Sequence, residues 1–182
     1  KMVGGMMYLL NIPTDKAGAL VKQICEFIRM RLKNMLIDQG IRYDIVDAVL
    51  SEERNDDVAE LYKRALALNA FVASEEAPAL IQAATRVSNL CKKIEEETAI
   101  NTGLFANPAE SALHEAVLAA SKEILTLEVR YDYAGVLAEA VKLVAPINEF
   151  FENVMVMDED VRVKNNRLAL LSAVKDVTHA VG

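Results

Sequence analysis

The 182-residue sequence predicts an all-α protein, a compact bundle of about seven or eight helices, and three observations lead to that fold class. The chain has only seven glycines and four prolines, while alanine, leucine, glutamate and lysine, which favour helices, are abundant. Apolar residues recur at spacings of three and four, as one-sided helices require. Hydrophobic residues make up 53% of the chain, which is enough to form one substantial core.

The first residues are expected to lie outside the bundle. Residues 1–13 end at a proline and are predicted to be a linker or the tail of a preceding domain, so the helical domain is expected over 14–182. Because the chain begins with Lys1 and not with an initiator methionine, we also expect it to be a piece of a longer protein.

Within 14–182, capping residues and helix breakers mark the expected helices. Thr14-Asp15 supplies an N-cap and Gly40 a stop for a long first helix. Two further helices are expected to begin at capping residues: Asp44 caps a short helix over 45–50, and Asn55 caps one that runs to about 72. Two more are expected to begin at prolines: Pro78 starts a helix that runs to about 97, and Asn107-Pro108 starts one that runs to about 128. A helix from Tyr133 must kink or restart at Pro146, and a last one runs over about 160–180. The Val-Met-Val-Met stretch at 154–157 fits either an extended segment or the end of a buried helix.

Composition argues against several classes of protein. No apolar run approaches the roughly 18–20 residues of a membrane span, so no membrane partner is expected. The net charge of −7 argues against a generally basic surface that coats RNA. Cys25 and Cys91 stand far apart and form no paired motif, which is typical of reduced thiols in a cytoplasmic protein.

The sequence contains no recognisable catalytic or metal-binding motif. Its two histidines, His114 and His179, belong to no zinc motif and to no known nucleophile frame. The acidic runs at 95–97 and 158–160 raise the alternative of a metal-dependent hydrolase. A solvated face explains the first run more simply, and complementarity to a helix dipole explains the second. No catalytic residue, cofactor or metal is therefore expected in this chain.

One helix face predicts a contact surface for nucleic acid. Because a helix turns about 100° per residue, four polar residues of the helix after Pro78 fall opposite its apolar stripe. They are Gln82, Arg86, Asn89 and Lys93. Guanidinium and amide groups can bind phosphates and base edges. Spacing alone favours an ordinary solvated face, so RNA contact by Arg86, Asn89 and Lys93 is a hypothesis.

The start of the last helix carries a second basic segment. Arg162, Lys164 and Asn166 lie off its apolar stripe and are expected to reach solvent and contact RNA. Residues 161–175 include basic side chains and no acid, so this end of the molecule is expected to be locally positive.

Two arginines fall on apolar stripes instead. They are Arg31 in the first helix and Arg167 in the last. An unpaired buried charge is very costly, so each is expected to form a structural ion pair with a carboxylate from a neighbouring segment. The candidate carboxylates are Asp44, Asp158 and Asp160.

The end of the chain resembles a known family. Residues 146–171 read PINEFFENVMVMDEDVRVKNNRLALL, which closely resembles the carboxy-terminal signature of bacterial glycyl-tRNA synthetase β subunits. Further similar segments occur in the right order: FIRMRL (27–32), DIVDAVL (44–50), RVSNL (86–90) and Tyr133 with Leu137. Glu152 stands where the family usually has aspartate. Lys164 stands where an arginine is common, which weakens a base-specific role for it but not a phosphate contact.

The resemblance, which spans about residues 27–171, implies a DALR-type anticodon-binding domain, an α-helical bundle. In that family the α subunit holds the site that uses ATP and Mg²⁺ to activate glycine, and the β subunit binds tRNA. The implied partners are the anticodon stem-loop of a glycine tRNA and the α subunit, in an α2β2 heterotetramer. The resemblance leaves open that Arg31 and Arg167 contact RNA. A helical scaffold that docks a protein partner is the alternative function.

Overall fold

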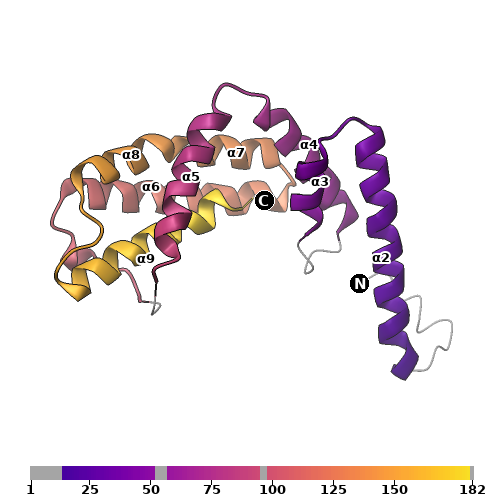
Figure 1. Ribbon diagram of the computed structural model, residues 1–182, viewed down its shortest axis with the longest axis horizontal. Helices are drawn as coiled ribbons and strands as arrows, with labels where there is room; N and C mark the ends of the chain where they lie inside the picture. The colour runs from indigo at the N-terminus through magenta and orange to yellow at the C-terminus, as the bar shows by residue number, and fades with distance from the viewer. Residues whose placement is uncertain (1–13, 52–56, 95–97, 181–182) are drawn as a thin grey trace. The chain divides into compact units, whose positions relative to one another are not determined.

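The computed structural model describes residues 14–51, 57–94 and 98–180, and over these ranges its regular secondary structure is helical, with no strand (Figure 1). The all-α prediction is confirmed. The chain divides into two compact units, one up to Leu66 and one from Ala67. The predicted linker at 1–13 lies outside the described residues, as do the proposed cap Asn55 and the acidic run at 95–97.

The first unit contains α2 (Thr14–Asp38), α3 (Tyr43–Leu50) and the first turns of α4 (Val58–Val72). Helix α2 packs against α3, and the chain reverses between them at Gly40, whose φ of +83° is accessible to glycine at little cost. The buried apolar residues of this unit are Leu32, Leu36, Ile41, Ile45, Val46, Val49, Leu61 and Ala65. Helix α4 is capped by Asp57, whose Oδ1 accepts the Ala59 and Glu60 amides at 3.0 and 3.2 Å.

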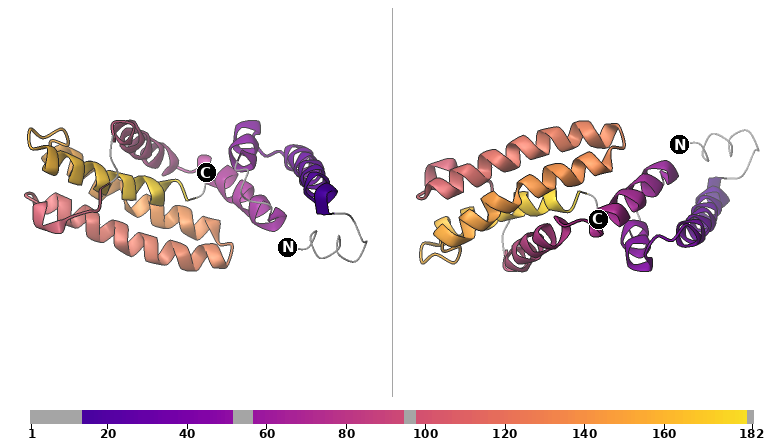
Figure 2. Two further views of the ribbon diagram at one scale, coloured as in Figure 1. Left: turned by 90° about the horizontal axis from the view of Figure 1, so that it is seen from below. Right: turned by 90° about the horizontal axis from the view of Figure 1, so that it is seen from above.

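The second unit is a layered helical bundle. It contains the end of α4, then α5 (Ala77–Cys91), the 3-10 helix η1 (Thr102–Leu104), α6 (Pro108–Val129), α7 (Tyr133–Lys142), α8 (Val144–Asn153) and α9 (Val161–Thr178). Helices α7 and α8 follow one another along α6, α9 also packs on α6, and α5 crosses α9 and contacts α8 (Figures 1 and 2). The largest fully buried side chains here include Leu113, Leu143, Ile147, Phe150, Leu170 and Leu171.

Local signals place most of these boundaries. Asn107 and Glu110 form a reciprocal capping box at the start of α6, in which Asn107 Oδ1 accepts the Ala109 amide at 2.9 Å and Glu110 Oε2 accepts the Asn107 amide at 2.8 Å. The helix expected from Tyr133 breaks at Leu143, and Pro146 lies in the first turn of α8. Helix α5 ends at Cys91, earlier than the expected end near residue 97.

The connection between α8 and α9, residues 154–160, is neither helix nor strand and is called the α8–α9 segment below. Its Val-Met-Val-Met sequence alternates between inside and outside. Val154 and Val156 are 7% and 6% exposed, whereas Met155 and Met157 are 78% and 43% exposed. The alternation therefore reflects an irregular segment with one buried side, and it places two methionines at the surface.

Candidate nucleic-acid interface

Helix α5 presents two of the predicted RNA-binding side chains at the surface. Leu80, Ala83 and Val87 are buried, so Arg86 and Asn89 on the opposite side are exposed. Lys93 is also exposed, but it lies in the turn that follows the end of α5 at Cys91. The helix face of the prediction therefore exists for Arg86 and Asn89, and Lys93 extends it along the chain.

Arg86 and Asn89 line a shallow groove of about 430 Å³ between α5 and the end of α8. We call it the α5–α8 groove, and the other residues that line it are Leu90, Phe151, Val154, Met155, Val156 and Met157. The guanidinium of Arg86 stacks over the ring of Phe151, with Cζ 4.0 Å from the ring centroid. None of the described residues that line this groove is acidic, so it combines apolar walls with a cation and an amide.

Asn89 is oriented by its neighbour Lys92. The ammonium of Lys92 donates to Asn89 Oδ1 at 3.1 Å. With its oxygen engaged, Asn89 can offer its amide NH₂ as a donor to a base edge. Lys92 was not among the predicted residues. It does not belong to the helix face formed by residues 82, 86, 89 and 93, and it is associated with the α5–α8 groove through its contact with Asn89.

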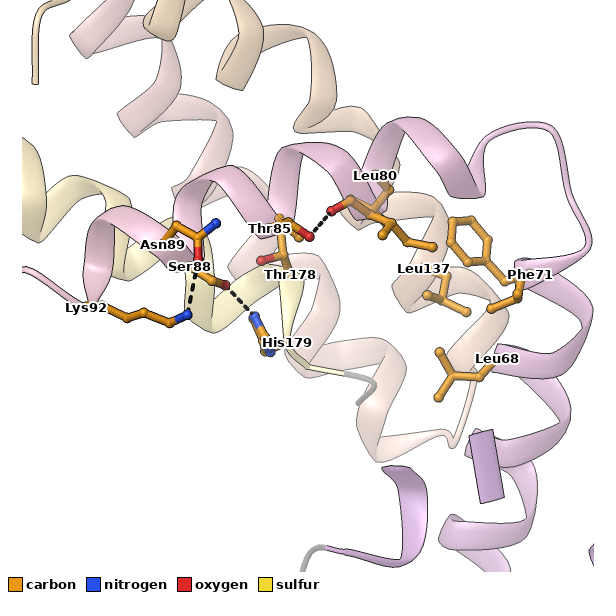
Figure 3. Close-up of a pocket in the computed structure, with 13 residues that line it drawn as sticks. Leu68, Phe71, Leu80, Thr85, Ser88, Asn89, Lys92, Leu137, Thr178 and His179 are labelled. Carbon is orange, nitrogen blue, oxygen red and sulfur yellow. Dashed lines mark hydrogen bonds between the residues drawn. The ribbon is translucent and has the colours of Figure 1, made fainter. Parts of the chain in front are cut away.

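A more enclosed, mostly apolar cleft of about 410 Å³, also lined by Asn89, lies between α5 and the end of α9, with further walls from α4 and α7. Figure 3 shows its apolar end, with Leu68, Phe71, Leu80 and Leu137, and its polar end, with Ser88, Asn89, Lys92 and His179. Ser88 Oγ and His179 Nε2 are hydrogen bonded at 3.0 Å. Most of the surface that this α5–α9 cleft offers a ligand is apolar.

At the start of α9, Arg162 is exposed and already paired. Its Nη2 lies 2.9 Å from Asp160 Oδ2, and Asp160 also caps α9 by accepting the Arg162 amide at 2.9 Å. The bonds from Arg162, first its side chain and then its backbone amide, lower the pKa of Asp160 to about 2. Asp160, expected as a partner for a buried arginine, pairs with this surface arginine instead. Lys164, two residues further, is half-buried.

Asn166 does not reach the surface, which corrects its assignment as an RNA-binding residue. It is 3% exposed, and its side-chain amide bonds the backbone of Asn101 in both directions. Its Oδ1 accepts the Asn101 amide at 2.6 Å, and its Nδ2 donates to the Asn101 carbonyl at 3.0 Å. Both polar groups are satisfied internally, so Asn166 fixes the chain before η1 and is withdrawn from the candidate RNA surface.

Arg167 lies at the centre of a buried ionic network. It is 7% exposed, and its Nε donates to Glu110 Oε1 at 2.8 Å while its Nη1 donates to Asp158 Oδ2 at 2.7 Å and to the Met155 carbonyl at 3.0 Å. Asp158 was an expected partner, whereas the fully buried Glu110 was not. Burial lowers the pKa of Arg167, but the two carboxylates outweigh it and the net pKa is raised.

Arg31 and Asp44 do not form the structural ion pairs that the sequence predicted. Arg31 is exposed, and its guanidinium lies 5.6 Å from the ring centroid of Phe27, itself 58% exposed. Asp44 pairs with Arg42, two residues away, at 2.6 Å. The apolar stripe of α2 extends beyond the part that the core buries, so a position on that stripe did not imply burial.

The described residues contain no group of three or more histidine, cysteine or acidic side chains that could hold a metal ion. His114 stacks edge-to-face on Phe105, and His179 bonds Ser88, so each histidine has a structural contact. Over the same ranges, none of the helices combines the length and the apolar character that a membrane crossing requires.

Comparison with known proteins finds one family and one group of relatives. The DALR anticodon binding domain family matches residues 80–181. Glycine–tRNA ligase β subunits are similar over most of the chain. That of Clostridioides difficile (strain 630) is 40% identical over 157 residues, which cover 86% of this chain and 22% of that protein. That of Ruegeria sp. (strain TM1040) is 37% identical over 88% of this chain and 24% of that protein. That of Shewanella sediminis (strain HAW-EB3) is 37% identical over 91% of this chain and 24% of that protein. The chain thus spans about a quarter of the length of these curated relatives.

Proposed function

We propose that this chain, which belongs to the DALR anticodon-binding domain family and is homologous to the C-terminal part of glycine–tRNA ligase β subunits, binds the anticodon stem-loop of a glycine tRNA through its second unit. The observation that carries the proposal is the α5–α8 groove, which lies within the family match and sets an exposed arginine and an amide beside apolar walls. Loop bases of RNA are recognised by stacking and by hydrogen bonds to their exposed edges.

The side chains divide into two roles in this proposal. Arg86 and Asn89 contact bases, because both line the groove and offer planar donor groups. Lys93, Arg162 and Lys164 contact phosphates, which positions the loop without reading its sequence. Arg162 must exchange Asp160 for a phosphate, and this exchange costs little because exposed ion pairs contribute little to stability.

The chemistry of the whole enzyme lies outside this chain. The relatives are named as β subunits of a glycine–tRNA ligase. We therefore propose that the protein containing this chain works in the cytoplasm with an α subunit, in an α2β2 assembly in which the α subunit uses ATP and Mg²⁺. The role of this domain is then to hold the glycine tRNA while its acceptor end is aminoacylated elsewhere.

The α5–α9 cleft favours the second candidate function, a scaffold that docks a protein partner. Its walls are mostly apolar, which suits a protein side chain better than a phosphate backbone. On this alternative the α5–α8 groove would carry no RNA, and the two functions therefore differ in a measurable property of the purified chain.

Binding of a labelled glycine anticodon stem-loop to the 182-residue chain tests the proposal. We expect the affinity to fall as salt rises, because phosphate contacts release counterions, and to fall again when either of the last two anticodon cytosines is replaced. A hairpin of the same length with an unrelated loop is the control. Equal, weak binding of both hairpins at all salt concentrations would favour the scaffold.

A further inference from the structure

The two exposed methionines of the α8–α9 segment stand out because their backbone is tightly held. The Met155 carbonyl accepts Arg167 Nη1 at 3.0 Å, the Val156 carbonyl accepts the Asp158 amide at 3.0 Å, and the Val154 amide donates to the Phe150 carbonyl at 2.9 Å. Val154 and Val156 are buried on the inner side of the same segment. The fold therefore fixes Met155 and Met157 at the surface.

A second part of the lining of the α5–α8 groove is also fixed. Arg86 rests on Phe151, whose ring makes an edge-to-face contact with the fully buried Phe150. A guanidinium that lies over a ring can offer its other face to a second flat group. A thioether is polarisable and makes favourable contacts with aromatic rings. The groove therefore has two kinds of surface suited to a flat aromatic group.

Charge and hydrogen-bonding capacity select what that flat group is. Among the described residues that line the groove, the polar side chains are Arg86 and Asn89, and they supply a cation and an amide donor, with no acid present. A nucleobase has apolar faces, acceptors on its edge and a phosphate attached through its sugar, and it complements this combination. An apolar side chain of a protein would leave both donors without acceptors, which is costly when they are covered.

We propose that the α5–α8 groove holds one unstacked base of the RNA loop, with Met155 and Met157 on one face and the Arg86–Phe151 pair on the other. This inference rests on the proposed function and adds three contact residues, Phe151, Met155 and Met157, that residue spacing did not indicate. The methionines act by stacking alone and carry no charge, and this sets them apart from the phosphate-binding lysines.

The test uses the full 182-residue chain with Met155→Ser and Met157→Ser together. We expect the affinity for the glycine anticodon stem-loop to fall about 3- to 10-fold, in line with thioether–ring contacts, while its dependence on salt stays unchanged. Met155→Leu and Met157→Leu together, which keep the apolar volume, retain most of the affinity. Met30→Ser is the matched control, because Met30 is 64% exposed but lies in α2 of the first unit, and it leaves RNA affinity unchanged. Thermal melts check that all variants are folded.

A double-mutant cycle with the RNA separates direct stacking from an indirect effect. Loop nucleotides are replaced one at a time by an abasic sugar, and each RNA is measured with the original chain and with the double serine variant. We expect one position at which the two losses are not additive, because both changes remove the same contact. Additive losses at every position, or unchanged affinity of the serine variant, overturn the inference while the proposed function stands. If the original chain does not distinguish the glycine loop from the control hairpin, the proposed function itself fails.

Discussion

Two arginines contact or adjoin the same α8–α9 segment and have opposite surroundings. Arg167 is buried, pairs with Glu110 and Asp158, and donates to the carbonyl of Met155. Arg86 is exposed, lies on the ring of Phe151, and lines the groove that includes the Met155 side chain. One arginine therefore fixes the backbone of the segment from inside, and the other forms part of the surface that the segment presents.

The difference shows how one residue type serves structure at one site and binding at another. A guanidinium with two carboxylates and a carbonyl has few donors left for a ligand. A guanidinium held on a ring keeps its donor edge directed to its surroundings, since stacking uses only its face. The family resemblance alone left open that Arg167 contacts RNA, and its burial and pairing make Arg86 the better candidate within our proposal.

The largest effect that tests this contrast is on stability. Arg167→Ala leaves Glu110 and Asp158 without their shared cation, and Glu110 is fully buried. We expect the free energy of unfolding to fall by about 3–5 kcal/mol, as for other broken buried ion pairs. Urea denaturation of the full chain measures it. Arg162→Ala, which breaks only the exposed pair with Asp160, is the control and leaves the urea midpoint nearly unchanged. Equal midpoints for the two variants would contradict the structural role of Arg167.

The matching change on the surface is Arg86→Ala. We expect a loss of stem-loop affinity of about 1–3 kcal/mol, roughly 5- to 150-fold, because a stacked planar donor is removed. Stability changes little, since Arg86 is exposed. Fluorescence titration with the labelled stem-loop measures the affinity, and Arg86→Lys, which keeps the charge but not the planar group, recovers only part of it. Full recovery with lysine would reduce Arg86 to a simple phosphate contact.

Two asparagines sharpen the comparison further. Asn166→Ala leaves the Asn101 amide and carbonyl without partners, so we expect the free energy of unfolding to fall by about 1–3 kcal/mol while the folded protein binds RNA as before. Asn89→Ala has the opposite outcome, with lower RNA affinity and unchanged stability. Melting curves measure the stability of both variants, and titrations measure their RNA affinity. A variant that loses both stability and RNA affinity would contradict the assignment of separate roles to Asn166 and Asn89.

The smallest expected effect is a dependence of stability on pH below neutrality. Bonds from the Asp160 amide and then from Arg167 lower the pKa of Asp158, and the bonds from Arg162 lower that of Asp160 to about 2. Because these folded-state pKa values lie below the unfolded value of about 3.9, the two carboxylates contribute their full stabilisation above about pH 4. That contribution is lost as pH falls toward about 2. Melting temperatures across this range should fall less steeply for Asp160→Asn than for the original chain, and parallel curves would remove Asp160 from this explanation.

Local patterns predicted the helices well, because their starts depend on residues close in sequence. Asn107 and Pro108 start α6, and Asp160 caps α9, as their types suggest. The groove was only half predictable. The 3.6-residue period indicated Arg86 and Asn89, but the partner wall comes from residues more than 60 positions later in the chain. The alternation at 154–157 was the available signal for Met155 and Met157, and it could be interpreted only once the buried side of the segment was known.

Long-range packing explains the site residues that the sequence misassigned. Asn166 stands three residues after Val163 and four before Leu170, so it lies at the edge of the apolar stripe of α9, and its expected exposure was wrong. It is buried there beside the chain around Asn101. Arg31 lies on the stripe of α2 and is exposed, because whether another element covers a helix face depends on contacts that a helical wheel does not contain. Glu110 was not predicted as a partner of Arg167 for a related reason. Its position in the first turn of α6 is explained by capping alone, and nothing local indicates its ion pair with Arg167.

The carboxylate of Glu110 joins a local contact to a long-range one. One oxygen accepts the amides of Ala106 and Asn107, and the other accepts Arg167, 57 positions further along the chain. The two amides come from residues close in sequence to Glu110, so they can orient its carboxylate without α9, whereas its buried charge is paired with Arg167 of α9. A ribosome must therefore synthesise the residues through Arg167 before the charge at the start of α6 is neutralised, which makes assembly of this bundle dependent on its final helix.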